Sequence, residues 1–279
     1  MYILKDYDTT LHNIINRGHF VPSRGGNTLS IMGAHCRYNI SEYFPIPTRR
    51  KVYYKSIFAE LLWMISGSTN INDLNSLGSK IWDFWRDPEF EKSNNYQNGD
   101  LGPIYGHSFV NFGGDYKSNN GFNQIQYLID ELLKNKFSRR ALINLWDPTV
   151  MTTSKVKLPT CHYSFQVVVD ANDNATGILT QRSGDWLPGV SANVYFYSAF
   201  LYMICQQTNL KPYELIHNVA NAHVYENQID SVKKYLSQPE VDSPKLELKK
   251  AKDIFSYSLE DFNIVNYNPG PIVKVPISI

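Results

Sequence analysis

The hydrophobic positions along the chain follow two different periods, which predict two kinds of element. Apolar residues recur every three to four positions in three segments, which predicts helices over residues 56–66, 123–134 and 194–207. Short apolar or alternating runs bounded by turn-forming residues predict strands over residues 28–40, 141–146, 161–170, 175–183 and 215–225. Because helices and strands intermix without strict alternation, we predict an α+β fold built on a large mixed β-sheet.

The polar stretches between these elements do not divide the chain into separate parts. No repeat of about 20 to 50 residues and no low-complexity linker interrupts the sequence, so we predict one domain over residues 1–279. Two segments rich in Asn, Gly and Asp, residues 86–100 and 111–122, are predicted to be surface insertions.

The overall charge argues against a nucleic-acid-binding protein. Lys and Arg number 27 against 26 Asp and Glu, so the net charge is +1 and the long-range field that holds a phosphate backbone is missing. At 279 residues and 43% hydrophobic content, the chain is long enough to bury a substantial core. An anionic ligand must therefore be bound by local groups.

Cysteine usage predicts a protein of a reducing compartment. The three cysteines Cys36, Cys161 and Cys205 are too few and too widely spaced for a disulfide framework, and no CxxC pair indicates zinc. The histidines near them show no metal-ligand spacing, so we predict no metal. The N-terminus is charged and no run approaches the ~20 apolar residues of a membrane span, which predicts a cytoplasmic protein without membrane contact.

Cys161 directly precedes His162 in a predicted strand, which raises the question of a catalytic pair. Successive side chains on a strand point to opposite faces, so the two residues are not expected to hydrogen-bond to each other. Taken alone, Cys161 is most simply a small buried hydrophobic residue. Nearby guanidinium groups would raise its thiolate fraction, because the thiolate is the charged form.

Arginines occur beside predicted strands in three places. Arg182 ends an apolar strand beside Ser183 and Asp185, and Arg139 with Arg140 precede another strand. Arg24 stands before a Gly-Gly-Asn loop. Each is compatible with an ordinary exposed turn, but together they indicate several guanidinium groups converging on a phosphate.

Glu60 lies within an apolar stretch of a predicted helix. Its neighbours three and four positions away are Ile57, Trp63 and Met64, with only Ser56 polar. Desolvation there would raise the pKa of the carboxyl, so that it could carry protons near neutral pH. A side chain that reaches around to solvent explains the periodicity equally well.

An aromatic cluster follows in the segment IWDFW and continues to Tyr105. Trp82 and Trp85, three residues apart, share one face and are typical of core packing. They would serve equally as a wall for a flat heterocycle, and the pattern alone leaves both readings open.

These motifs together resemble the thymidylate synthase family over almost the whole chain. The segments that carry the resemblance stand in family order: TLSIMGAHCRYNI, SIFAELLWMISGSTNI, IWDFW, GDLGPIYG, SRRALINLWDP, LPTCH, QRSGDWLPGVSAN, AHVYENQ and PIVKVPISI. The resemblance implies the family fold, a large twisted mixed sheet flanked by helices that packs at a homodimer interface. It also implies methylation of dUMP to dTMP with 5,10-methylenetetrahydrofolate as one-carbon and hydride donor, without a metal.

The resemblance assigns roles to individual residues. The implied catalytic set is Cys161 as nucleophile toward the pyrimidine, with Glu60, Tyr105, Arg182, Asp185 and Asn193. The implied dUMP-binding set is Arg24, Arg182, Ser183, Asp185, Asn193, His223 and Tyr225, with Asn221 in support and Arg139 and Arg140 supplied by the partner subunit. The implied folate-binding set is Arg50, Lys51, Trp82, Trp85, Asp185, Gly189 and Ile279, the last in a terminal segment that closes over the site.

The chain departs from the family pattern at three places. Arg24 is shifted by one residue in its loop, and Thr160 replaces the usual Pro before Cys161. Ser191 and Ala192 replace a larger pair before Asn193, and the lost bulk would admit water. An alternative activity is therefore a dUMP hydroxymethylase, in which water captures the exocyclic methylene. A non-catalytic nucleotide- or RNA-binding relative is a further alternative, disfavoured by the full set of reactive residues and the near-zero net charge.

Overall fold

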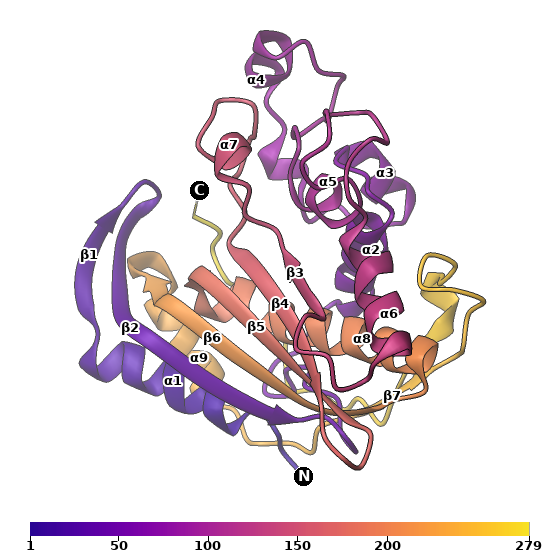
Figure 1. Ribbon diagram of the computed structural model, residues 1–279. Coiled ribbons are helices and arrows are strands. Elements are labelled where there is room, and N and C mark those ends of the chain that lie inside the picture. The colour runs from indigo at the N-terminus through magenta and orange to yellow at the C-terminus, as the bar shows by residue number, and fades with distance from the viewer. Residues whose placement is uncertain (279) are drawn as a thin grey trace.

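The protein is built around one six-stranded β-sheet, as shown in Figure 1 by a computed structural model that describes residues 1–278. The strands lie in the order β1-β2-β6-β5-β4-β3, and a separate hairpin pairs β7 with β8. Their bounds are β1 His19–Ser23, β2 Gly26–Asn39, β3 Leu142–Asn144, β4 His162–Val169, β5 Asn174–Asp185, β6 Lys211–Tyr225, β7 Lys245–Leu248 and β8 Phe262–Val265.

The sheet is mixed, as the sequence predicted. All neighbouring strands pair antiparallel except β5 and β6, which run parallel. The long helix α8 makes the crossover between these two strands. The helices are α1 Lys5–Arg17, α2 Tyr54–Ile65, α3 Ile71–Ser76, α4 Pro88–Ser93, α5 Tyr105–Val110, α6 Gln124–Lys134, α7 Pro148–Met151, α8 Ser191–Thr208 and α9 Ile229–Leu236. The α+β prediction is therefore confirmed.

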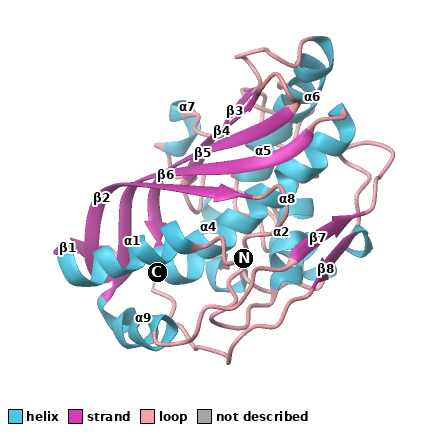
Figure 2. Cartoon of the chain, turned by 90° about the horizontal axis from the view of Figure 1, so that it is seen from below, coloured by secondary structure: helices cyan, strands magenta, loops and turns pink. Residues whose placement is uncertain are grey.

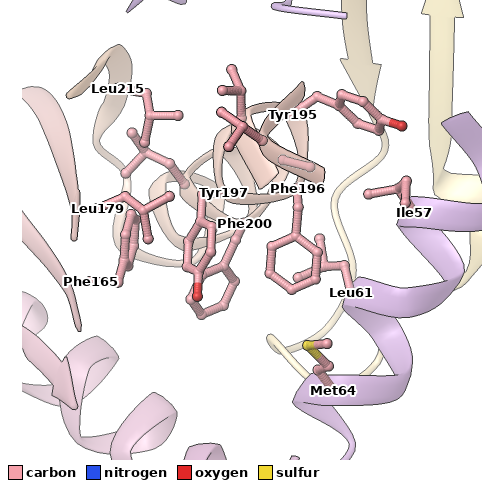
Figure 3. Packing of buried hydrophobic residues seen from close by; sticks show 14 of the residues in the cluster. Ile57, Leu61, Met64, Phe165, Leu179, Tyr195, Phe196, Tyr197, Phe200 and Leu215 are labelled. Carbon is pink, nitrogen blue, oxygen red and sulfur yellow. The ribbon is translucent and has the colours of Figure 1, made fainter. Parts of the chain in front are cut away.

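Helix α8 forms the centre of the core because its sequence is apolar on almost every side. Most of its residues are buried, as expected of a helix covered all round. Its aromatic side chains lie between the sheet and α2 (Figure 3). The residues labelled there come from β4–β6 (Phe165, Leu179, Leu215), from α8 (Tyr195, Phe196, Tyr197, Phe200) and from α2 (Ile57, Leu61, Met64). Asn209 ends the helix in the left-handed conformation, with φ 56°.

Helices α1 and α8 cover the same face of the sheet (Figure 2). Residues of β5 alternate between buried and half-buried along the strand, which shows that one face meets the core and the other does not. Ile178 of β5 and Ile216 of β6 lie on the open face, and Leu142 of β3 is 43% exposed. An open sheet face that carries several apolar side chains is typical of an interaction surface.

The two segments predicted to be surface insertions are only partly exposed, and that prediction was wrong for three of their polar residues. The side chains of Glu91, Asp100 and Asn111 are buried. Two of them accept hydrogen bonds that fold their own segment back on itself: Glu91 Oε1 from the Gly99 N–H at 2.8 Å and Asn111 Oδ1 from the Gly121 N–H at 2.6 Å. Asp100 pairs with Lys117 at 2.6 Å. Buried polar groups of this kind are satisfied locally, so composition alone does not expose them.

Two kinds of feature are not found within residues 1–278. None of the helices in this range is both long enough and apolar enough to cross a membrane. No group of three or more His, Cys, Asp or Glu side chains in the same range is arranged to hold a metal ion. The predictions of a cytoplasmic, metal-free, single-domain protein stay predictions.

Two leucines of α6 test the assignment of its buried face. Leu128 is fully buried and Leu133 is 58% exposed, so the same change to Ala probes both faces of one helix. Leu128→Ala should lower the free energy of unfolding by about 3 kcal/mol, because it removes buried methyl groups and leaves a cavity. Leu133→Ala should change it by less than about 1 kcal/mol. Urea unfolding followed by circular dichroism measures both, and equal losses would contradict the assigned orientation.

Candidate active site

The candidate site lies at one edge of the sheet, where several chain segments end or begin. Strand β4 runs antiparallel to β5, so the start of β4 lies beside the end of β5, with His162 opposite Gln181. The parallel strand β6 ends at the same edge, with His223 opposite Asp185. Helix α8 begins just after β5, which brings Asn193 to the same place.

Cys161 lies one residue before β4, not within the strand as the sequence predicted. It is half-buried, and its backbone N–H donates to the Tyr105 hydroxyl at 2.7 Å. The Arg182 Nη2 lies 3.7 Å from the sulfur. The Arg182 side chain is held in this position by the carbonyls of Thr160 and Pro159, to which it donates at 2.8 and 2.9 Å. Arg182 is therefore fixed beside the thiol.

Two opposing effects act on the Cys161 thiol. Burial raises the pKa of Cys161, while the Arg182 guanidinium, the Tyr105 hydroxyl and Arg24 lower it. In the single chain the effect of burial is the larger, so the pKa of Cys161 is raised overall. The expectation that nearby guanidinium groups favour the thiolate holds for the direction in which Arg182 acts. A ligand or second chain that brings further positive charge would favour the thiolate.

His162 points away from Cys161 into the core. Its Nδ1 lies 2.6 Å from the Tyr197 hydroxyl, and its ring stacks on Tyr105 with centroids 4.2 Å apart. Burial lowers the pKa of His162 to about 3, so the ring is neutral at physiological pH. A neutral, inward-facing imidazole packs the base of the site and does not act as the base for the thiol.

Glu60 reaches the site from α2. The Trp82 indole Nε1–H donates to its Oε1 at 2.5 Å, and Trp82 also lies edge-on to Tyr105. Burial raises the pKa of Glu60 to about 7, against a smaller opposite effect of the Trp82 hydrogen bond. The carboxyl can therefore gain and lose a proton near neutral pH.

Asp185 ends β5 and is the second acidic group with a raised pKa. Burial raises the pKa of Asp185 to about 7, and the Gln228 Nε2–H donates to its Oδ2 at 2.9 Å. Its Oδ1 is buried without a hydrogen-bond partner among residues 1–278. Gly189 in the following π-helical turn, Trp186–Val190, approaches closely: a Cβ there would lie 3.9 Å from the Asp185 Cβ. One carboxylate oxygen thus lacks the donor that a buried polar atom normally has.

Asn193 is held in a defined orientation by the core behind it. Its Nδ2 donates to the Gln181 Oε1 at 3.1 Å, and that same oxygen lies 3.0 Å from the His217 Nε2. The Gln181 Nε2 donates to the Ser183 carbonyl at 2.8 Å, which fixes the Gln181 amide. The Asn193 Oδ1 and the remaining N–H are therefore presented together as an acceptor and a donor.

The end of β6 supplies the last group of polar side chains. The His223 Nδ1 lies 2.8 Å from the Asn221 Oδ1, and the His223 ring lies edge-on to Tyr225 with centroids 5.4 Å apart. Ser183 of β5 pairs in register with Asn221. Ser183, His223 and Tyr225 thus line the same edge as Asp185.

Arg24 reaches the site from the turn between β1 and β2. Its guanidinium carbon lies 5.8 Å from the centre of the Trp85 ring, and its charge lowers the pKa of Cys161. The one-residue shift in its loop therefore does not remove this arginine from the site.

Arg50 and Lys51 lie next to α2. The Arg50 Nη2 donates to the Leu187 carbonyl at 3.0 Å, and its Nε is buried without a partner among the described residues. Lys51 is exposed and lines a hollow of about 620 Å³ together with Tyr53 and Lys55. This hollow carries the positive charges of Lys51 and Lys55.

Arg139 and Arg140 lie away from the Cys161 of their own chain. Both are exposed, and the Arg139 carbonyl accepts from the Gln166 Nε2 at 3.0 Å. Gln166 is five residues along from Cys161, which at the rise of a strand corresponds to about 16 Å. Ile279, also predicted as a site residue, lies outside the described residues.

Known proteins resemble this chain over nearly its full length. A family profile described as thymidylate synthase matches residues 5–279. The chain belongs to the thymidylate synthase family. Among similar proteins, the thymidylate synthase of Malacoplasma penetrans is 35% identical over 99% of this chain and 100% of its own length. Those of Mycoplasma genitalium and Homo sapiens are 36% and 37% identical, each over 91% of this chain and over 92% and 84% of their own lengths.

Membership of the thymidylate synthase family confirms the resemblance and the fold class predicted from the sequence. It also makes the chain a methyltransferase-type enzyme. The roles of individual residues remain proposals, which the geometry described above supports to different degrees.

Three neighbours of the site were missed by sequence reasoning. Trp146 lies beneath Arg182, with the guanidinium carbon 5.6 Å from its ring centre. Gln228 contacts Asp185, and His217 contacts Gln181. Trp146 and Gln228 lie in segments shared with the thymidylate synthase family, but no periodicity or charge pattern separates them from ordinary core or surface residues.

The raised pKa of Glu60 predicts a pH-dependent stability. Its folded pKa of about 7 exceeds the ordinary value of 4.5, so the folded state binds more protons between these values and its stability falls as the pH rises. Glu60→Gln removes this ionisation. Relative to the wild type, its free energy of unfolding should therefore increase by roughly 2 kcal/mol between pH 5 and pH 8. Urea unfolding at both pH values measures the difference.

A matched control is Glu89→Gln in α4, where the side chain is exposed. It should leave the difference between the two pH values unchanged. If the Glu60 and Glu89 variants respond alike, the carboxyl of Glu60 does not titrate as its burial implies.

Proposed function

We propose that the enzyme converts dUMP to dTMP, using 5,10-methylenetetrahydrofolate as one-carbon and hydride donor and releasing dihydrofolate. The observation that carries this proposal is the placement of Cys161 beside Arg182 at the sheet edge to which Asn193 and Asp185 also belong. This arrangement joins a nucleophile, a base-reading amide and a carboxyl in a protein of the thymidylate synthase family.

Cys161 is proposed to add to carbon six of the pyrimidine, which makes carbon five nucleophilic toward the one-carbon unit. A thiolate is required, and the Arg182 guanidinium 3.7 Å from the sulfur favours it. Arg182 and Arg24, with the Ser183 hydroxyl, are proposed to bind the nucleotide phosphate. A bound phosphate would also interact with Arg182 and Arg24. The pKa of Cys161 therefore depends on every charge that a ligand brings to the site.

Asn193 is proposed to distinguish uracil from cytosine. Because Gln181 fixes one Asn193 N–H, the Oδ1 is left to accept from the uracil ring N–H while the other N–H donates to the adjacent carbonyl. Cytosine presents an unprotonated ring nitrogen and an amino group at these positions, so the same amide would mismatch both. His223 and Tyr225 are proposed to hold the sugar hydroxyl.

Glu60 and Asp185 are proposed to move and hold protons during the reaction. Burial raises the pKa of each to about 7, which suits a group that must exchange protons at neutral pH. Tyr105, which accepts from the Cys161 N–H, is proposed to support the nucleophile from behind.

The folate co-substrate is proposed to lie between Trp82, Trp85 and Asp185, with its glutamate tail toward Arg50 and Lys51. When bound, it supplies the methylene group and then the hydride. The residues of this chain orient it and exclude water, and the C-terminal segment is proposed to help by closing the site. Ser191 and Ala192 are small, so water exclusion rests largely on Trp82 and this terminal segment.

The enzyme is proposed to act as a homodimer. Arg139 and Arg140 lie roughly 16 Å along the sheet from their own Cys161, but beside the open sheet face that carries Ile178, Ile216 and the exposed Leu142. Two copies joined through this face would cover its apolar surface. The arginines of each copy are proposed to reach the phosphate in the other.

The reaction is tested by supplying dUMP and methylenetetrahydrofolate, with dCMP as the control substrate. Dihydrofolate absorbance should appear together with dTMP, and dCMP should give neither. Cys161→Ser should reduce turnover by at least about 10³-fold while dUMP binding stays measurable, because the hydroxyl is a far weaker nucleophile than the thiolate.

Two results would contradict this reaction. Formation of 5-hydroxymethyl-dUMP with tetrahydrofolate would show that water, and not hydride, captures the one-carbon unit. Undiminished turnover in Cys161→Ser would show that another group is the nucleophile.

The shared site is tested by mixing two inactive variants. Cys161→Ser lacks the nucleophile, and the double variant Arg139→Ala with Arg140→Ala lacks the proposed partner arginines. Exchange of subunits creates one intact site in each mixed dimer, so equal mixing should restore about a quarter of wild-type turnover. Mixed dimers that form, as shown by mass spectrometry, but remain inactive would exclude shared arginines.

A further inference from the structure

A single buried side chain, Gln228, connects the acidic end of β5 to the C-terminal segment. Gln228 is fully buried in the 3-10 turn Glu226–Gln228. Its Oε1 accepts from the Tyr225 N–H at 3.1 Å, which fixes which end of the amide carries the hydrogens. Its Nε2 then donates to the Asp185 Oδ2 and to the Pro276 carbonyl, both at 2.9 Å.

The C-terminal segment, residues 272–278, is held at two further points near this turn. The Asn227 Nδ2 donates to the Ser278 hydroxyl at 3.2 Å, and the Ser231 hydroxyl donates to the Lys274 carbonyl at 2.8 Å. In Figure 1 this yellow segment rises beside the strand ends that carry the candidate site. Three residues thus hold the segment: Gln228, Asn227 and Ser231. Of these, only Gln228 also hydrogen-bonds to a residue of the candidate site, Asp185.

We propose that Gln228 is a positioning residue that couples docking of the C-terminal segment to the orientation and charge of Asp185. The importance of this coupling for turnover rests on the proposed function, in which Asp185 and the terminal segment both contact the folate. The coupling itself does not depend on that function.

The coupling has a physical basis in the Gln228 amide, whose two hydrogens are donated to Asp185 and to the Pro276 carbonyl. An N–H donated to a carboxylate stabilises its charged form, so Gln228 opposes the effect of burial on Asp185. If the terminal segment leaves, the second N–H loses the Pro276 carbonyl and must find another acceptor, either water or a group that the amide reaches by moving. Either change alters the surroundings of the bond to Asp185, whose Oδ1 has no other partner among residues 1–278.

No other charged group in residues 1–278 competes with Gln228 for this carboxylate through an ion pair. His223 is the cross-strand neighbour on β6, and burial lowers its pKa, which disfavours its charged form. Tyr7 of α1 and Arg50 face the next turn and donate to the carbonyls of Trp186 and Leu187. The Asp185 charge therefore responds mainly to burial and to Gln228.

The test uses the unliganded full-length protein and two independent measurements. The pKa of Asp185 is measured by ¹³C NMR of labelled aspartate, assigned with Asp185→Asn. Docking of the terminal segment is measured by the rate at which endoproteinase Lys-C cleaves after Lys274, which is exposed. Neither measurement requires substrate or turnover, so failure of the proposed reaction would not affect them.

Gln228→Met keeps the length of the side chain and removes its hydrogen bonds. We expect the pKa of Asp185 to rise and cleavage after Lys274 to become about fivefold faster, as loss of one hydrogen bond implies. The matched control Asn227→Ala removes a contact to the segment but none to Asp185. It should also speed cleavage, while the pKa of Asp185 rises less than in Gln228→Met.

A second variant covers the case in which Gln228→Met does not fold. Gln228→Glu keeps the acceptor for Tyr225 but places a carboxyl against Asp185 and Pro276. It should likewise raise the pKa of Asp185 and speed cleavage. The proposal is overturned if the folded variant leaves either quantity at its wild-type value, or if Asn227→Ala changes both quantities as strongly as the Gln228 variant does.

Discussion

The parallel pairing of β5 with β6 is the constraint on which the site depends. Every other neighbouring pair in the main sheet is antiparallel, so this pair alone requires a crossover, and α8 provides it. The crossover starts where β5 ends, which places Asn193 beside Asp185. Because β6 ends and β4 begins at this same edge, His223 and Cys161 join them. Residues from distant parts of the sequence are thus brought together by one topological feature.

The burial that stabilises the core also sets the protonation of the groups around the site. It raises the pKa of Glu60 and of Asp185 to about 7 and lowers the pKa of His162 to about 3. The carboxyls are therefore the groups that exchange protons near neutral pH, and the histidine is a neutral packing residue. For Cys161, burial opposes ionisation, so the charge of Arg182 works against the environment that holds the sulfur in place.

The sequence predicted five strands of the main sheet and helices α2, α6 and α8 because their patterns are local. The alternation in β5 and the apolar run of α8 are visible in the letters themselves. Several elements that were not predicted, such as β1 and α9, are short, and β1 is largely exposed, so its side chains carry no alternation. The 13-residue helix α1 was not predicted either. Their existence depends on pairing or packing with distant segments.

The same contrast between local patterns and long-range packing applies to the candidate site. The roles of Cys161, Arg182 and Asn193 were implied by the resemblance of their motifs to the thymidylate synthase family, since the local patterns alone left simpler readings open. Gln228 was not found, since an amide near the start of a short helix is indistinguishable from a surface residue until the fold buries it. The position of Arg24 over Trp85 also required the structure, because it depends on how the β1–β2 turn reaches across to a distant loop.

The Trp146 indole lies beneath the Arg182 guanidinium, so its fluorescence is sensitive to the charge at Arg182. The emission of an indole depends on the electric field at its ring, and this ring lies against a cation that is tied to the backbone. An anion that neutralises Arg182 changes that field without moving the ring. Binding of the nucleotide proposed for this site should therefore alter the fluorescence of Trp146 without any attached label.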